Sequence, residues 1–173
     1  MKKQDTLEKQ ANIAYLAIGS NLGNRINNIE KTKFELEKYK IKILKLSSNY
    51  VSDSWPDTSK PNYINIVIKI KTSLEPMQLL KVCNLIEFKL GRSRTKDNAP
   101  RTCDIDIIDY NRIIVGKKNN ELILPHPRMS KRNFVLLPLF EIDKSWKHPE
   151  TKVNIVKLIN SLPIKDLRSI KQI

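Results

Sequence analysis

The segment 63–71 constrains the fold most strongly, because isoleucine occupies every even position from 64 to 70. Successive side chains of a strand point to opposite faces of a sheet, so this segment predicts a strand with one apolar face. Such a face needs neighbouring strands and a covering layer of helices before it is buried. The chain is therefore expected to build a sheet and not a bundle of helices.

The remaining predicted elements indicate an α+β fold. Asn24 can cap a helix that runs to about residue 39, and Pro76 and Gly91 suit the two ends of another helix. Segments 113–115 and 122–124 flank a polar turn and predict a hairpin. Strands are also expected at 13–19, 41–48 and 102–110, and helices at 133–142 and 153–161. We expect a mainly antiparallel sheet with helices on one face, in a single domain at 12–173 that follows a polar tail at 1–11.

The composition excludes several kinds of site. Four glycines are too few and too scattered for a G-x-G-x-x-G turn or a phosphate loop. The two cysteines and two histidines are far apart, so neither a structural zinc site nor a disulfide framework is expected. Two unpaired thiols suit a reducing compartment, so we expect a cytoplasmic location. No signal peptide or apolar run long enough to cross a bilayer is present. The net charge of +14 suggests an anionic partner, although much of it is expected to be diffuse, solvated lysine.

Asp104 and Asp106 are the strongest candidates for chemistry. Residues two apart on a strand share a face, so both carboxylates should point away from the core that Cys103, Ile105 and Ile107 enter. Such a pair can bind one or two Mg²⁺ ions. The alternative is a solvated strand face on which two like charges merely repel. Asp109 is an odd number of residues from both, so regular alternation should point it to the other face, and it is not expected to join the pair.

Basic residues lie close to this strand in the sequence. Arg92, Arg94 and Arg101 precede it, and their guanidinium groups suit phosphate oxygens. Ordinary surface ion pairs are the alternative for each of them. His126 stands between two prolines, where it either donates to a phosphate or ribose oxygen or satisfies local backbone groups.

Aromatic and amide side chains suggest a second half of the same site. Tyr63 and Asn65 share the strand face opposite the isoleucines. With Trp55 and Phe134 they could form a slot for a flat heterocycle, in which the amide reads its polar edge. Ordinary packing of the strand is the alternative interpretation of these residues.

Five segments then occur in an order that identifies a family: AYLAIGSNLGNR, YVSDSW…PNYIN, LIEFKLGRSR, PRTCDIDII and LPHPRMSKRNFVLLPLFEI. From about Asn12 to Pro163 the chain resembles the 6-hydroxymethyl-7,8-dihydropterin pyrophosphokinases of folate biosynthesis. The resemblance implies a ferredoxin-like α+β fold. It also implies transfer of the terminal diphosphate of ATP to the hydroxymethyl group of the pterin, which leaves AMP.

The resemblance also implies a role for each matched residue. Asp104 and Asp106 would hold two Mg²⁺ ions on the triphosphate. The catalytic arginines that clamp the phosphates would be Arg92 and Arg101. The remaining contacts with ATP would come from Glu87, Arg94, the backbone near Ile107, His126 and Arg132. The pterin pocket would consist of Ser52, Asp53, Trp55, Tyr63, Asn65 and Phe134.

Some positions depart from the pattern of that family. Its pocket loop commonly has Thr, Pro, Leu and Gly where this chain has Ser52, Asp53, Trp55 and Pro56. The wall of the pterin pocket is therefore expected to differ.

Two further classes remain open from the residues alone. One is a metal-dependent nuclease or nucleotidyltransferase that uses the same Asp pair. The other is a basic RNA-binding module, although the chain lacks the aromatic run of ferredoxin-like RNA binders. For the pyrophosphokinase, we expect a cytoplasmic enzyme, monomeric or weakly oligomeric, that binds neither nucleic acid nor membrane.

Overall fold

The computed structural model describes residues 11–54, 57–92, 99–116 and 121–173. Except for residue 11, the predicted polar tail lies outside them. Described strands form one antiparallel sheet in the order β5-β1-β4-β3-β6, with β2 also paired to β4. The strands are β1 (Asn12–Ser20), β2 (Lys42–Leu46), β3 (Tyr50–Ser52), β4 (Tyr63–Thr72), β5 (Asp104–Tyr110) and β6 (Lys171–Gln172). The expected α+β class is confirmed.

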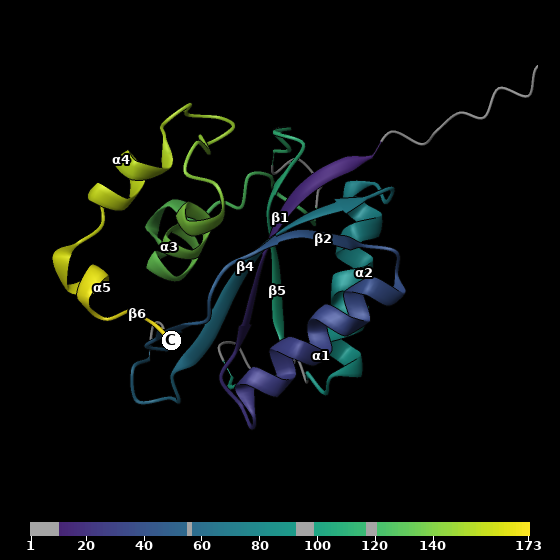
Figure 1. The fold of residues 1–173 in the computed structure, drawn as a ribbon, viewed down its shortest axis with the longest axis horizontal. Coiled ribbons are helices and arrows are strands. Elements are labelled where there is room, and N and C mark those ends of the chain that lie inside the picture. Colours follow the sequence, from purple (N-terminus) through teal and green to yellow (C-terminus); the bar gives the residue numbers. More distant parts are fainter. Residues whose placement is uncertain (1–10, 55–56, 93–98, 117–120) are drawn as a thin grey trace, which may run out of the picture.

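Two long helices, α1 (Arg25–Lys38) and α2 (Pro76–Lys89), cover one face of the sheet (Figure 1). The even-numbered isoleucines of β4 are buried against them together with Leu16 and Ile18 of β1. Asn24 caps α1 as expected, because its side chain accepts a hydrogen bond from the Asn27 N–H. This layer is the one that the alternating pattern of β4 predicts.

The opposite face of the sheet is also covered, so the expectation of helices on one face was wrong. It packs against η1 (Met129–Lys131), α3 (Asn133–Ile142) and α4 (Ile155–Asn160), which lie on the far side of the sheet from α1 in Figure 1. Tyr15, Val67 and Ile108 are the strand residues buried there. The physical reason is visible in β1, where a nearly continuous apolar run gives the strand two buried faces.

The end of the chain returns to the sheet. After α5 (Ile164–Arg168), β6 pairs with β3, and the Ile173 N–H donates to the Asn49 carbonyl at 2.9 Å. The hairpin predicted at 113–124 does not form as two strands, because the described residues there pair only at the single bridge Val115–Leu124. Within the described residues, no helix is both long and apolar enough to cross a membrane.

An irregularity in β5 changes which way Asp109 points. Tyr15 pairs with Asp109 and Leu16 pairs with Ile107, so Ile108 is an extra residue opposite this step of β1. Such a bulge reverses the alternation beyond it. Asp109 therefore lies on the same face as Asp104 and Asp106, contrary to the parity argument, although it stands at the far end of the strand.

Candidate active site

A pocket of about 170 Å³ opens on the sheet where β1 ends and β4 and β5 begin. Its floor is made of small residues, because Gly19 lies between Asn65 and Asp104 on the neighbouring strands and Ala17 lies next to Asp106. Four arginines and three aspartates line it, which leaves one excess positive charge among its described residues. The lining residues are Ala17, Ile18, Gly19, Ser52, Asp53, Tyr63, Asn65, Arg92, Arg101, Asp104, Asp106, Arg128, Arg132 and Phe134.

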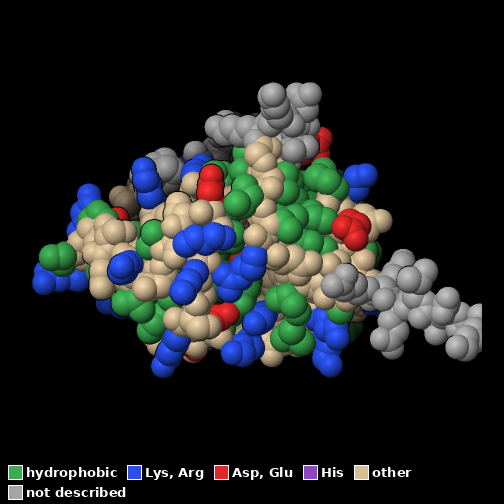
Figure 2. Space-filling model, turned by 90° about the horizontal axis from the view of Figure 1, so that it is seen from above, with side chains coloured by type: hydrophobic (Ala, Val, Ile, Leu, Met, Phe, Trp, Pro, Cys, Tyr) green, Lys and Arg blue, Asp and Glu red, His purple; other side chains and the backbone are tan. Residues whose placement is uncertain are grey.

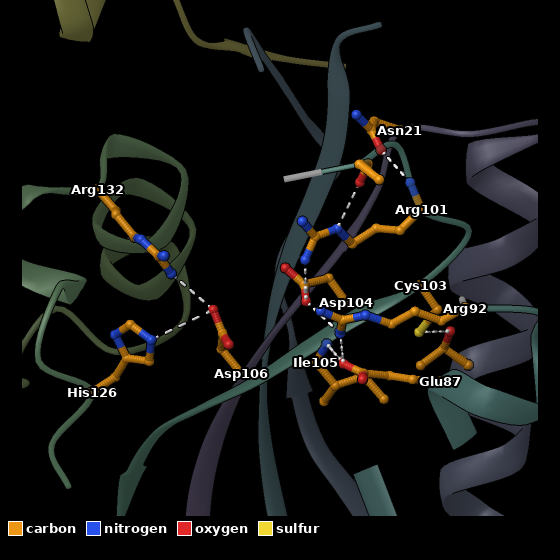
Figure 3. Close-up of polar contacts among 12 residues, drawn as sticks. Asn21, Glu87, Arg92, Arg101, Cys103, Asp104, Ile105, Asp106, His126 and Arg132 are labelled. Atoms are coloured by element: carbon orange, nitrogen blue, oxygen red, sulfur yellow. Dashed lines mark hydrogen bonds and ion pairs between the residues drawn. The ribbon is translucent and has the colours of Figure 1, made fainter. Parts of the chain in front are cut away.

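The carboxylates of Asp104 and Asp106 point out of β5 into this pocket, as the alternation predicts. The Asp104 Oδ1 atom accepts hydrogen bonds from Arg92 Nη1 at 2.7 Å and Arg101 Nη1 at 3.2 Å. The Asp106 Oδ2 atom accepts from Arg132 Nη1 at 2.8 Å. Figure 3 shows Arg92 and Arg101 on one side of the Asp pair and Arg132 with His126 on the other. The site thus brings together arginines from three separate segments.

Glu87 lies beneath this arrangement and does not line the pocket. Its buried Oε1 atom accepts a hydrogen bond from the Ile105 N–H at 2.8 Å and forms an ion pair with Arg92. Burial of the Arg92 guanidinium opposes its charge, but Asp104 and Glu87 outweigh this effect and raise its pKa. Glu87 therefore ties Arg92 to the start of β5. The side chain of Ile107 is buried in the core on the face that α2 covers.

His126 approaches the Asp pair from the loop before η1. Its Nε2 atom lies 3.7 Å from Asp106 Oδ2. Its Nδ1 atom accepts a hydrogen bond from the Arg128 N–H at 3.2 Å, so the neutral ring carries its proton on Nε2. Burial lowers the pKa of His126, and Asp106 only partly opposes this shift. His126 is thus a neutral donor that faces a carboxylate.

The other half of the pocket holds the aromatic and amide groups. Asn65 donates from Nδ2 to Ser52 Oγ at 2.9 Å, which fixes its amide at the pocket wall. A Cβ atom on Gly19 would lie 3.0 Å from the Asn65 Oδ1 atom, so any larger residue would push against the side chain that Ser52 holds. The Arg132 guanidinium lies 5.4 Å from the centre of the Phe134 ring and joins the two halves of the pocket.

Most of the residues predicted to form the site meet in this pocket. Trp55 and Arg94 lie outside the described residues, as does Pro56. Sequence reasoning missed Gly19 and Arg128, although both stand in segments that carry the family resemblance. Among the described residues, three predicted ones are not part of the pocket lining: Glu87, Ile107 and His126.

The donor set fits Mg²⁺. Among the described residues, the ion pairs end on one oxygen of each carboxylate. The described residues contain no group of three or more His, Cys, Asp or Glu that could hold a metal ion. The two carboxylates that point into the pocket are the kind of ligand that Mg²⁺ uses together with substrate phosphates.

The distribution of charged side chains can be followed on one face of the molecule. On the face seen in Figure 2, lysines and arginines are spread among hydrophobic and uncharged groups. This distribution agrees with diffuse, solvated lysine.

Comparisons with known proteins agree on one family. The family model described as 7,8-dihydro-6-hydroxymethylpterin-pyrophosphokinase (HPPK) matches residues 15–144. The folic acid synthesis protein fol1 of Pneumocystis carinii is 37% identical over 170 residues, which cover 98% of this chain and 22% of that protein. The 2-amino-4-hydroxy-6-hydroxymethyldihydropteridine pyrophosphokinase of Bacillus subtilis is 41% identical over 132 residues, which cover 76% of this chain and 78% of that protein.

The fold is shared with solved structures as well. A crystal structure of wild-type HPPK-DHPS of Plasmodium falciparum with pteroate matches with a TM-score of 0.70 and 16% identity. The match covers 87% of this chain and 44% of that chain. The chain therefore spans less than half of these longer relatives and about four-fifths of the bacterial one.

Proposed function

Since this chain belongs to the 7,8-dihydro-6-hydroxymethylpterin-pyrophosphokinase family, we propose that it transfers diphosphate from ATP to the hydroxymethyl group of 6-hydroxymethyl-7,8-dihydropterin. The products would be AMP and the pterin diphosphate, in folate biosynthesis. One observation carries this proposal: a single pocket joins a carboxylate pair and four arginines to an aromatic and amide wall.

The ring half of the pocket suits the pterin. Phe134 and Tyr63 offer flat apolar surface, and Asn65 offers an amide edge whose orientation Ser52 fixes. An amide has both a donor and an acceptor, as does the polar edge of a pterin. Asp53 adds a carboxylate to this wall, and we propose that Trp55 completes it.

The phosphate half suits the triphosphate of ATP. Arg92, Arg101 and Arg132 each present a guanidinium next to a carboxylate of the Asp pair, so an arriving phosphate meets donors that are already oriented. His126 would add an uncharged Nε2–H donor, and Arg94 a further guanidinium. We propose that Glu87 acts by holding Arg92 and that the backbone near Ile107 lies close to the nucleoside.

The reaction is a displacement at the β-phosphorus of ATP. A bond forms between the hydroxymethyl oxygen and this phosphorus, the bond to the bridging oxygen of the α-phosphate breaks, and the hydroxyl proton is released to solvent. Negative charge develops on the departing AMP. We propose that Arg101 and Arg92 stabilise this charge and that no protein nucleophile takes part. Asp104 and Asp106 would hold two Mg²⁺ ions, which would neutralise charge along the triphosphate.

The direct test follows the nucleotide product. The protein is incubated with ATP, Mg²⁺ and the reduced pterin, and nucleotides are separated by ion-exchange chromatography. We expect AMP in amounts equal to the pterin diphosphate, and none when the pterin is omitted. ADP would indicate a monophosphate transfer and would contradict the proposal, as would cleavage of RNA by the same preparation.

The state of the two cysteines bears on where the enzyme works. Cys83 and Cys103 are both buried as free thiols. This agrees with a reducing cytoplasm, where we place the enzyme. We further propose that residues 12–173 act as one domain, either monomeric or weakly associated.

A further inference from the structure

Asn21 connects the two halves of the pocket without lining it. It follows β1 directly and is only 2% exposed. Its Oδ1 atom accepts a hydrogen bond from the Arg101 N–H at 2.8 Å. Its Nδ2 atom donates to Ser54 Oγ at 3.2 Å and to the Pro61 carbonyl at 3.3 Å. One amide group therefore bonds both to the segment that carries Arg101 and to the loop that follows β3.

The bonds to Arg101 fix its main chain in two places. The Asn21 N–H donates to the Arg101 carbonyl at 3.1 Å, in addition to the bond that the side chain accepts from the Arg101 N–H. Figure 3 shows Asn21 next to the main chain of Arg101, whose guanidinium extends to Asp104. A shift of Asn21 would therefore change where the Arg101 side chain starts, and with it the donor that faces the phosphates.

The bonds on the other side reach the wall of the pterin pocket. Ser54 also donates from Oγ to the Pro61 carbonyl at 2.6 Å, which closes the loop between β3 and β4 onto itself. The residues just before Ser54 are Ser52 and Asp53, which line the pocket, and Ser52 holds Asn65. The Asn21 amide is thus connected to the Asn65 amide, which is proposed to bind the pterin edge, through two hydrogen bonds and the main chain between Ser54 and Ser52.

The orientation of the Asn21 amide is fixed. Exchange of its nitrogen and oxygen would place a donor against the Arg101 N–H and an acceptor against the Pro61 carbonyl, with a repulsive contact on each side. The side chain is also buried, so water cannot take over its hydrogen bonds. Asn21 can therefore transmit the position of one loop to the other.

We propose that Asn21 is a positioning residue that holds Arg101 in register with the pterin loop, so that ordering of the phosphate half also orders residues 52–54 and 57–63. The proposal rests on the proposed function of the pocket. It predicts that nucleotide bound at Arg101 lowers the mobility of a loop that the nucleotide does not need to touch. A purely structural asparagine would stabilise the fold without this dependence.

The test separates the two sets of bonds. Asn21→Asp keeps an acceptor for the Arg101 N–H but removes the donor to Ser54 and Pro61. Amide hydrogen exchange is followed with and without a non-hydrolysable ATP analogue and Mg²⁺. In the wild-type protein we expect the analogue to slow exchange at least fivefold both at 99–104 and at 52–63. In Asn21→Asp the first effect should remain, the second should be lost, and kcat should fall at least tenfold.

Two further variants keep the test decisive. Ser54→Ala removes one of the two acceptors of Asn21 and should lower kcat about threefold, so it provides a test even if Asn21→Asp does not fold. Asn28→Ala is the matched control, because the Asn28 side chain donates to Ser20 Oγ and the Leu22 carbonyl in the same turn instead of to the described residues of either pocket loop. It should lower the melting temperature while kcat and the protection at 52–63 are retained.

The possible failures are distinguishable. If the wild-type protein forms AMP but the analogue does not protect 52–63, or protects it equally in Asn21→Asp, the role of Asn21 is refuted and the proposed function stands. If the wild-type protein forms no AMP with ATP, Mg²⁺ and the pterin, the proposed function itself is refuted.

Discussion

The two ends of β5 carry aspartates on the same face of the sheet, but in opposite circumstances. At the pocket end, the side chains of Asp104 and Asp106 are 28% and 31% exposed and face arginines. At the far end, Asp109 is 1% exposed, and its Oδ2 atom accepts a hydrogen bond from Trp146 Nε1 at 2.9 Å. Burial raises the pKa of Asp109, although the bond from Trp146 opposes this shift.

The difference lies in the donors. Arginines on loops and helix ends can turn from a carboxylate to a phosphate, whereas the indole of Trp146 is fully buried and stays with Asp109. Each end even has an arginine three residues from its aspartate: Arg101 lies 3.2 Å from Asp104, and Arg112 lies 3.5 Å from Asp109. The same type of pair thus belongs to the proposed chemistry at one end and to the fold at the other.

The largest effect is expected from removal of the pocket carboxylates. Asp104→Ala or Asp106→Ala should lower kcat at least a thousandfold, or about 4 kcal/mol, because each removes a proposed Mg²⁺ ligand. Neither change leaves a core cavity, so the melting temperature should stay close to that of the wild type. Steady-state AMP formation at saturating Mg²⁺ measures the effect, and near-normal turnover of either variant would refute the metal assignment.

The next largest effect separates the two matched arginines. Arg101→Ala should lower kcat about 100- to 1000-fold, the usual cost of losing a donor to charge that develops in the transition state. Arg112→Ala should leave kcat within about twofold, since its partner is Asp109. Calorimetric titration with an ATP analogue completes the test. A large rise in the dissociation constant of Arg101→Ala with unchanged kcat would make Arg101 an anchor for the ground state.

At the far end, the effect should appear in stability instead of turnover. Asp109→Ala leaves Trp146 Nε1 buried without its acceptor, which costs about 1–3 kcal/mol. Urea unfolding measures this loss, while kcat per folded molecule should be unchanged. The double variant Asp109→Ala with Trp146→Phe removes both partners and should lose less than the sum of the single changes. Additive losses would show that this hydrogen bond does not explain the stability.

The smallest effect concerns pH. Burial lowers the pKa of His126, and burial also lowers that of His148 near Asp109. Above the unfolded pKa of about 6.5, both states hold the ring uncharged and its burial costs nothing in charge. As the pH falls from there through the folded pKa, the unfolded state binds the proton first, so the free energy of unfolding decreases. Each of His126→Gln and His148→Gln should therefore reduce the loss of unfolding free energy between pH 7.5 and 5.5. An unchanged loss in His126→Gln would contradict the burial argument for that ring.

Sequence reasoning succeeded where the signal is local. The alternation in 63–71, the cap at Asn24 and the direction of Asp104 and Asp106 all depend on residues within one element. The regular strand period applies up to Ile107, so the side chains of the pocket end were predicted correctly.

Sequence reasoning failed where the structure of a segment depends on partners that are distant in the sequence. The bulge at Ile108 turns Asp109 toward Trp146, which is 37 residues away, and no local pattern marks it. The strands β3 and β6 are too short to show an alternating pattern. They are defined by their pairing, β3 with the longer β4 and β6 with β3. The pattern of α2 alone does not mark Glu87, which was predicted only through the resemblance; its contacts with Ile105 and Arg92 depend on the packing of α2 against β5.

The absence of a side chain at Gly19 has a consequence for inhibitor design. Any substitution there brings a Cβ atom to 3.0 Å from the Asn65 Oδ1 atom and 3.3 Å from Tyr63 Cδ1, both in the wall proposed to bind the pterin. A larger residue at position 19 could obstruct a compound bound against the Gly19 backbone only if Asn65 and Tyr63 shift by a few tenths of an ångström, and both stand in that proposed wall. A substitution at position 19 that confers resistance to such a compound should therefore also lower the activity of the enzyme.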